Sequence, residues 1–238
     1  MNKPDSNFYL KAFAWMCYFS TIISISSCAE PVLDQDRDLE PFTGIKVGGA
    51  FNVVLNQTGR HGVTIEAEED VIDKIRTDVK GDILHIDMKW DWSWDDQDIT
   101  IYVDFDQLES LQISGASDVR AETPIRADDL EVSLSGAADM DLELDASSLD
   151  ITISGAGNVN ISGNTQTQKV RLSGAGDYKA QNFKSKYTHA KASGAGSAVV
   201  FASEEIEAYA SGAGSVMYYG DPEMVKTDAS GAGSISRR

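Results

Sequence analysis

Apolar residues recur at every second position in short runs along the C-terminal half of the chain. Each run is interrupted by a stretch of small residues that reads SGAS, SGAA or SGAG. Positions three and one before the first serine of each stretch, and five and seven after it, are mostly apolar. A spacing of two is the periodicity of β-strands. Each repeat therefore predicts short strands separated by a corner, and the corners begin at Ser114, Ser135, Ser154, Ser173, Ser193, Ser211 and Ser230.

The corners recur with a nearly constant period of about nineteen residues. A unit of this length is too short to bury its own apolar face, so it must stack on its neighbours, as the turns of a solenoid do. No unit contains a long stretch at helical spacing. The pattern predicts an all-β, single-stranded parallel β-helix in which each strand pairs with its equivalents about 4.8 Å away.

Glycine occupies the second position of every corner. A corner needs residues that adopt positive φ or let one backbone pack directly on another, and glycine does both. A phosphate-binding glycine loop would instead be a single loop that opens a helix, so repetition without helices argues against that interpretation. The expected structural corners are Gly115, Gly136, Gly155, Gly174, Gly194, Gly212 and Gly231.

The N-terminal half, residues 41–110, follows a different pattern. Residues 42–55 and 62–67 are expected to form strands, and Gly48-Gly49-Ala50 resembles a diverged corner. Residues 69–79 place several apolar side chains on one helical face, which predicts a short helix. Residues 83–88 and 99–105 alternate as a hairpin would. We therefore expect the first coils plus a helix and hairpin cap here, followed by seven small-residue coils over 111–238.

The last coil reaches Arg238 without a capping segment. An open edge strand is a template for further pairing. Two alternatives stay open: Ser236, Arg237 and Arg238 blunt this edge, or another subunit covers it and the protein is a homo-oligomer.

Composition narrows the classes of partner. A hydrophobic content of 42% indicates a folded chain with a sizeable core. The 38 acidic residues exceed the 20 basic ones and give a formal charge of −18. This balance argues against nucleic acid and against electrostatic docking on anionic lipid, since both need clustered Lys and Arg. It fits a solvated, self-repelling surface.

The first residues have the features of an export signal. Lys3 and Lys11 accompany an apolar stretch over 12–25 that is too short to span a bilayer. Ile25-Ser26-Ser27-Cys28 then resembles a bacterial lipobox. We expect residues 1–27 to be a signal peptide, Cys28 to be lipidated, and residues 28–40 to be an acidic, flexible tether.

This assignment makes the protein a lipid-anchored member of the bacterial cell envelope, with the outer membrane as the expected location. Cys17 would leave with the signal peptide, so no thiol would remain for a disulfide, a metal or a nucleophile. An ordinary secretory peptide that is cleaved nearby is the alternative.

Three segments together resemble the "head GIN" domain family of autotransporter adhesins, formerly a domain of unknown function, from Bacteroidetes-type lipoproteins. The matching residues are FTGIKVGGAFNVVLNQTG, EDVIDKIRTDVKGDILHIDMK and the SGAGD and SGAGS units, from about residue 42 to 238. The resemblance implies a right-handed β-helix on the cell envelope. It implies no catalytic or ligand residues.

The corners also carry a column of polar residues four positions after each serine, which includes Asp118, Asp139 and Asp177. Carboxylates stacked at the interstrand distance repel one another unless they are hydrated, protonated or bridged, and Ca²⁺ is the cation that such oxygen ligands suit. The competing interpretation is a solvent-facing polar corner, because Asp and Asn favour turns. The nine-residue glycine–aspartate repeat of calcium β-rolls is absent from the sequence.

Trp90, Trp92 and Trp94 alternate with acidic and polar residues in KWDWSWDDQD. On a continued strand they would share one face and could stack on sugar rings, which makes them a candidate ligand platform. Alternatively, the three indoles cover the cap or the side of the solenoid.

No catalytic constellation stands out. His61, His85 and His189 are scattered, and neither HExxH nor GxSxG occurs. The leading hypothesis is a non-catalytic envelope module that binds glycan or protein for adhesion. The alternatives are a pectinase-like lyase or hydrolase on the same scaffold, for which cross-coil acidic pairs would be required, and a periplasmic signalling accessory.

Overall fold

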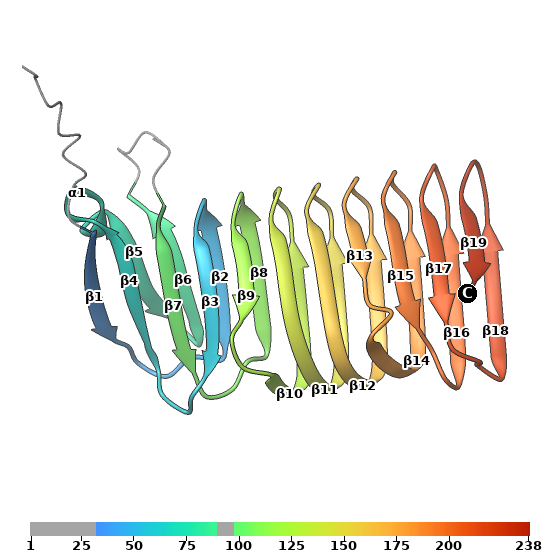
Figure 1. The fold of residues 1–238 in the computed structure, drawn as a ribbon, viewed down its shortest axis with the longest axis horizontal. Coiled ribbons are helices and arrows are strands. Elements are labelled where there is room, and N and C mark those ends of the chain that lie inside the picture. The colour runs from blue at the N-terminus through green and yellow to red at the C-terminus, as the bar shows by residue number, and fades with distance from the viewer. Residues whose placement is uncertain (1–31, 90–97) are drawn as a thin grey trace, which may run out of the picture. The chain divides into compact units, whose positions relative to one another are not determined.

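The computed structural model describes residues 32–89 and 98–238. In this part of the chain, strands follow one another around a stack of coils that lie side by side (Figure 1). All 19 described strands belong to one continuous hydrogen-bonded sheet, and the one described helix is a single turn. The predicted β-helix is therefore confirmed as a β-solenoid.

The sheet folds into two walls that meet at the small-residue corners. The first wall contains, in spatial order, β5 (Ile75–Lys80), β6 (Ile83–Met88), β2 (Gly44–Gly49), β8 (Ser110–Gly115), β10 (Ile125–Leu134), β14 (Phe183–Ala192), β16 (Glu205–Ala210) and β18 (Met224–Ala229). The second wall contains β1 (Val32–Asp38), β4 (Gly62–Glu68), β7 (Thr100–Phe105), β3 (Asn52–Gln57), β9 (Asp118–Ala121), β13 (Asp177–Lys179), β15 (Ser197–Phe201), β17 (Ser215–Tyr219) and β19 (Ser234–Arg237). Two long strands, β11 (Asp139–Ile153) and β12 (Asn158–Leu172), bend from one wall into the other between β10 and β14.

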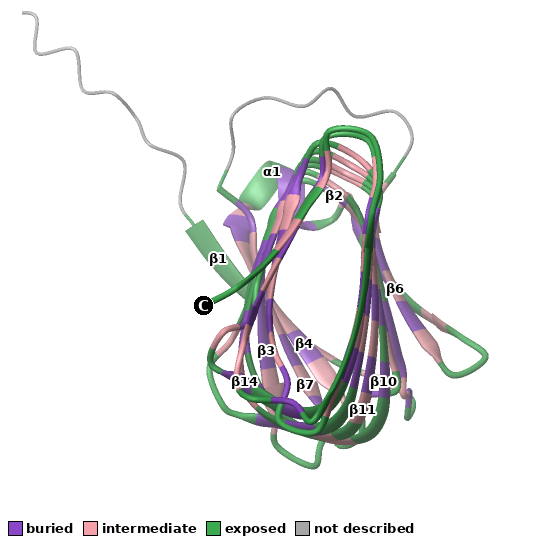
Figure 2. Cartoon of the chain, turned by 90° about the vertical axis from the view of Figure 1, so that its right-hand side faces the viewer, coloured by how far each residue is buried: buried purple, intermediate pink, exposed green. Residues whose placement is uncertain are grey.

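Neighbouring coils pair in parallel and in register, so equivalent residues stack into columns. Met140 lies beside Val159, and Ile151 lies beside Val170. These residues point inward and are buried, whereas the residues between them face outward, as the alternating colours of Figure 2 show. The period of two read from the sequence thus becomes a filled apolar interior between two polar outer faces.

The small-residue corners bring one backbone directly onto another. The Ala156 N–H donates to Gly136 O at 3.0 Å, and equivalent bonds repeat along the column. A Cβ on Gly155 would lie 1.8 Å from Gly136 O. Within the column, only Gly115, Gly212 and Gly231 have φ in the left-handed region. In the middle coils, therefore, the close approach and not the dihedral requires glycine.

Chain order and spatial order differ in the N-terminal part. β2 lies between β6 and β8, and β3 lies between β7 and β9. The first coil is therefore enclosed by two later coils. Gly49 stands beside Gly115 and accepts a hydrogen bond from the Ala116 N–H, which confirms that Gly48-Gly49-Ala50 is a corner.

A short helix and an antiparallel hairpin form in the N-terminal part as predicted, but with other bounds. The helix α1 spans only Glu69–Ile72, and the rest of the predicted helix over 69–79 is strand β5. β5 pairs antiparallel with β6. Ile75 and Val79, four residues apart, fit one face of a helix, but together with Thr77 they also fit the inward face of a strand. The predicted hairpin of residues 83–88 and 99–105 does not form, since β6 and β7 lie in different walls.

The prediction of a flexible tether over 28–40 is wrong for residues 32–38. Residues Val32–Asp38 form β1, which pairs antiparallel with β4 along its whole length. Arg37 explains why so polar a segment is ordered: its guanidinium donates to Ile75 O at 2.8 Å, Thr77 Oγ1 at 2.9 Å and Ile72 O at 3.1 Å. Burial lowers the pKa of Arg37, although Asp73 and Asp78 partly oppose this. An antiparallel strand therefore ends the sheet where a tether is expected.

The opposite end of the stack is open in the described chain. β18 and β19 each pair on one side only. Val225 continues the inward column of Ile206, yet it is 50% exposed, and the neighbouring Met224 is 58% exposed. The last coil thus leaves apolar positions without a covering layer.

A carboxylate on the outer face of the first wall joins three of the last coils. Glu207 on β16 accepts hydrogen bonds from Lys226 on β18 and from Tyr209, and its Oε2 lies 2.8 Å from His189 Nδ1 on β14. These three hydrogen bonds lower the pKa of Glu207 to about 2, and the one from Lys226 has the largest effect, followed by those with His189 and Tyr209. The network lies on the outer face of strands whose neighbouring inward residues, Ala190 and Ala208, are small and buried.

We predict that Gly155→Ala destabilises the fold by about 3 kcal/mol, because the added methyl group overlaps Gly136 O and must push two coils apart. Gly48→Ala is the matched control: its Cβ would meet Ser114 Oγ at 3.5 Å, an ordinary contact. It should change stability by less than about 1 kcal/mol. Urea unfolding followed by circular dichroism measures both, and equal losses would contradict the close-approach explanation.

We also predict that Glu207→Gln destabilises the protein at neutral pH and that the loss shrinks in acid. A carboxylate whose pKa is depressed in the folded state stabilises above its unfolded value of 4.5, and that contribution is lost as the pH falls toward about 2. Thermal unfolding from pH 7 to pH 2 tests this. Glu223→Gln, an exposed carboxylate outside the network, is the control and should show no such convergence with wild type.

Candidate functional site

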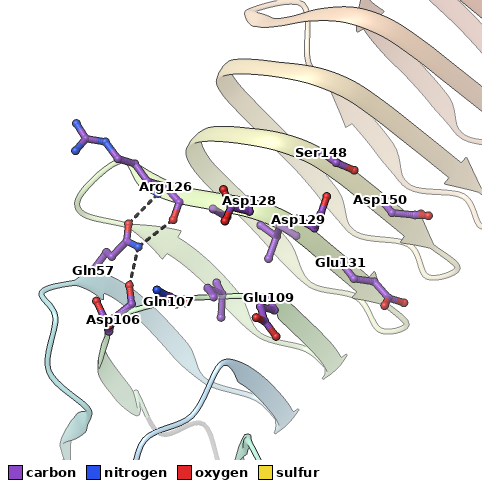
Figure 3. Close-up of a pocket in the computed structure, with 13 residues that line it drawn as sticks. Gln57, Asp106, Gln107, Glu109, Arg126, Asp128, Asp129, Glu131, Ser148 and Asp150 are labelled. Carbon is purple, nitrogen blue, oxygen red and sulfur yellow. Dashed lines mark hydrogen bonds between the residues drawn. The ribbon is translucent and has the colours of Figure 1, made fainter.

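Space for a ligand lies on the outer surface, because aliphatic and aromatic columns fill the interior of the solenoid. A hollow of about 850 Å³ opens beside the first wall, near the end of β3 (Figure 3). It is lined by Gln57, residues 106–109, residues 126–131, Ser148 and Asp150.

The hollow exists because two neighbouring strands differ in length. β10 pairs with β11 from Ile125 onward, but its pairing with β8 begins only at Glu131, opposite Ser110. Before that point, residues 106–109 form no strand and cross from one wall to the other. Their one backbone hydrogen bond to β10 among those described is from the Glu131 N–H to Glu109 O. The first half of β10 therefore has a strand neighbour on one side only.

Gln57 closes one end of this gap. Its side-chain Oε1 accepts from the Arg126 N–H at 2.8 Å, and its Nε2 donates to Arg126 O at 2.9 Å and to Asp106 O at 2.7 Å. Figure 3 shows the amide reaching from the end of β3 to the main chain of β10. The side chain thus makes the same pair of contacts that a neighbouring strand would make.

The lining is strongly acidic. Arg126 is the one cationic residue among the lining residues, and its guanidinium points away from the hollow in Figure 3. The six carboxylates of the lining are Asp106, Glu109, Asp128, Asp129, Glu131 and Asp150. Asp150 is held by Arg171 at 2.5 Å and Lys169 at 3.5 Å. Leu108 and Leu130 are also among the lining residues, but both are buried in the core of the solenoid and expose almost no apolar surface to the hollow. The hollow therefore combines an open strand edge with a negative rim.

The structure places the predicted aspartate column on the outer face of the second wall. Asp118 and Asp139 are neighbours in the register, but Asn158 separates Asp139 from Asp177. Asp139 Oδ1 accepts from both the Asn158 N–H and its side-chain amide at 2.9 Å, and Asp177 Oδ1 accepts from the Ser197 hydroxyl at 2.6 Å. These carboxylates thus bind the next coil.

Within residues 32–89 and 98–238, no group of three or more His, Cys, Asp or Glu side chains is placed to hold a metal ion. The Ca²⁺ site stays a prediction without support from this geometry. The histidines lie apart: His61 packs edge-on against Phe42 with ring centroids 5.0 Å apart, and His189 belongs to the Glu207 network.

The outer face of the second wall changes character along the stack. Arg120, Asp141, Asn160 and Lys179 make it polar over β9 to β13, and Asn160 donates to Asp141 at 3.1 Å. Over β15 and β17 it becomes apolar, with Val199 beside Met217 and Phe201 beside Tyr219. We call these last four residues the apolar patch. Lys184 borders this patch, and its Nζ lies over the Phe201 ring, 4.0 Å from the ring centre.

Several predicted site residues fall beyond what the structure describes. Trp90, Trp92 and Trp94, together with Cys28, lie outside the described residues. No helix among the described residues is both long and apolar enough to span a membrane.

Sequence reasoning missed the hollow entirely. Gln57, residues 106–109 and residues 126–131 belong to no motif, and the stacking of coils brings them together although Gln57 precedes Arg126 by 69 residues. One signal was present: the step from Ser114 to Ser135 is the longest of the series. A long step indicates that one coil carries extra residues. They lie just before the hollow, because Arg120 and Ile125 are five residues apart and their partners Asp141 and Leu144 only three.

A family model described as "Putative auto-transporter adhesin, head GIN domain" matches residues 41–222. Among solved structures, the chain is similar to a "putative adhesin" from Bacteroides fragilis, with a TM-score of 0.85 and 23% identity over 88% of this chain and 98% of that one. It is also similar to a "putative adhesin" from Parabacteroides distasonis, with a TM-score of 0.71 and 20% identity over 88% and 98%.

A third similar structure, also from Parabacteroides distasonis, is a "putative lipid binding protein" with a TM-score of 0.68 and 19% identity over 87% of this chain and 96% of that one. At these identities the solved structures establish the shared fold alone. No protein of curated function matches the chain. The family match covers most of the sequence, and the chain therefore belongs to the head GIN domain family of adhesin-like proteins.

Proposed function

We propose that this protein is a non-catalytic adhesion module of the bacterial envelope, held in the outer membrane by a lipid on Cys28, that binds a glycan or a protein. Family membership and the adhesin names of similar structures support the adhesion-type role. The lipobox-like sequence before Cys28 supports the anchor.

The observation that carries the proposal is the filled interior. Columns of fully buried side chains run through the stack, from Ile45 and Val53 to Val200 and Ile206. A ligand is therefore restricted to the outer walls and corners, where polar columns repeat from coil to coil. A rigid scaffold with broad repetitive faces suits binding of an extended partner.

Two outer surfaces suit such a partner by their chemistry. The apolar patch presents Phe201 and Tyr219 side by side, and aromatic side chains contribute strongly to binding of both sugars and proteins. The acidic hollow offers carboxylates and an unpaired strand edge. The tryptophans at 90, 92 and 94 remain a third candidate platform.

The test compares cells that express the full chain with cells that express Cys28→Ala. The lipid-anchored protein should fractionate with membranes, and protease treatment of intact cells should digest it if it is displayed outward. Cys28→Ala should appear in the soluble fraction. Equal membrane association of both forms would contradict the anchor, and protection from protease would favour a periplasmic role.

Adhesion itself is measured with the purified chain on glycan and protein arrays. Wild type, a Trp90/Trp92/Trp94→Ala variant and a Phe201→Ala/Tyr219→Ala variant are compared, and the variant that removes the binding surface should lose at least about tenfold in signal. Depolymerisation of an acidic polysaccharide by wild type would instead establish the lyase or hydrolase alternative.

We also propose that two copies of the chain associate through the open coil of β18 and β19. A second copy would cover Val225 and the free edges of both strands. Light scattering should then give a dimer mass that falls to the monomer mass in Val225→Lys, because a charge is placed in the new contact. A monomer mass for wild type at high concentration would contradict this proposal.

A further inference from the structure

We propose that the hollow beside β10 binds an extended peptide with alternating apolar and basic residues, which adds to the first wall as an extra strand. This inference rests on the proposed function, since it names the class of protein partner that an adhesion module would hold. The feature that carries it is the incomplete strand neighbour of β10, and the acidic residues decide only the charge of the ligand.

The first half of β10 has one edge without a neighbouring strand. Ala127, Asp129 and Leu130 pair with β11 on one side, and β8 on the other side begins too late to reach them. In a parallel sheet, alternate residues direct their N–H and C=O groups to opposite neighbours. Some main-chain groups of this segment therefore face the hollow, where an added strand would satisfy them.

Gln57 shows that this edge accepts a partner in the geometry of a strand. Its amide both donates to and accepts from the main chain of Arg126, immediately before the open segment. The contact also limits the site, because it occupies the edge at Arg126. The ligand would continue from Gln57 toward Glu131, where β8 takes over.

The dimensions suit a short extended segment. At about 3.3 Å per residue, residues 127–130 span roughly 13 Å. The volume of about 850 Å³ lies within the range typical of ligand sites, roughly 300–1,000 Å³. The hollow thus has room for one peptide strand with its side chains.

The two faces of the hollow set the sequence of the ligand. Leu108 and Leu130 belong to the buried core on the inner side of the hollow, at 1% and 2% exposure. The inward side chains of an added strand would continue this core and should therefore be apolar. Asp128, Asp129 and Glu131 are exposed at its rim. Since successive side chains of a strand point to opposite faces, the outward ones should be Lys or Arg.

The test uses the full chain and a fluorescent probe peptide of sequence Lys-Val-Lys-Val-Lys, with Glu-Val-Glu-Val-Glu as its charge-reversed control. Fluorescence anisotropy should detect binding of the basic peptide only. Two N-methylated forms of the basic peptide keep its charge but remove the N–H groups of either the lysines or the valines. Strand addition requires that one form lose affinity by at least about tenfold while the other retains it.

Asp128→Asn/Asp129→Asn removes two rim charges and should weaken the basic peptide by about tenfold. The matched control, Asp141→Asn/Glu143→Gln, removes two exposed charges outside the lining of the hollow and should leave affinity unchanged. Hydrogen exchange at residues 127–130 should slow when the peptide binds. This readout does not depend on either variant.

Three results would overturn the inference: no binding of the basic peptide, equal binding of both N-methylated forms, or equal weakening by the two variants. Equal binding of the N-methylated forms would mean that the acidic rim attracts cations without strand addition. Adhesion on the arrays that persists alongside any of these results would leave the proposed function standing and remove only the peptide site.

Discussion

The close approach of backbones at the small-residue corners is the contact on which the rest of the structure depends. From Gly115 to Gly194, each corner sets the glycine Cα of one coil so close to the carbonyl oxygen of its neighbour that no side chain fits. Hydrogen bonds from the adjacent serine and alanine N–H groups repeat the same offset along the column. Because this offset is fixed at the corner, the strands that leave it enter both walls already in register.

Fixed register separates the structural from the variable positions of each coil. Inward residues must fit their neighbours in the column. Between Leu144 and Phe183 this position is Gly163, whose φ of 116° and close approach to Leu144 O leave no room for a side chain. Outward residues face few such constraints, and the second wall changes from polar to apolar without any change in strand pairing. The surface can therefore differ among members of the family while the stack is preserved.

Local periodicity in the sequence predicts the strands and corners that repeat. It fails for segments whose structure depends on a strand far away in the sequence. The columns around Ile113 and Val119 alternate in every coil, so the sequence alone predicts the walls, the corners and their stacking. Residues 75–80 satisfy both a helical and a strand pattern, and only the presence of β6 beside them selects the strand. Residues 32–38 carry almost no apolar pattern and become ordered through β4 and the contacts of Arg37. The acidic hollow has no local signature, because it arises from the unequal lengths of β8 and β10.

The enclosed position of the first coil has a consequence for how the chain acquires its structure during synthesis. Residues 44–57 emerge early, but their neighbours on both sides, β6 to β9, extend to residue 121. About half of the chain must therefore be available before the N-terminal module is complete, which requires long-range closure and is slow. Every later coil then finds a finished template and adds by contacts roughly one repeat apart. Assembly thus divides into one slow nucleation event and a fast, directional growth that follows the order of translation.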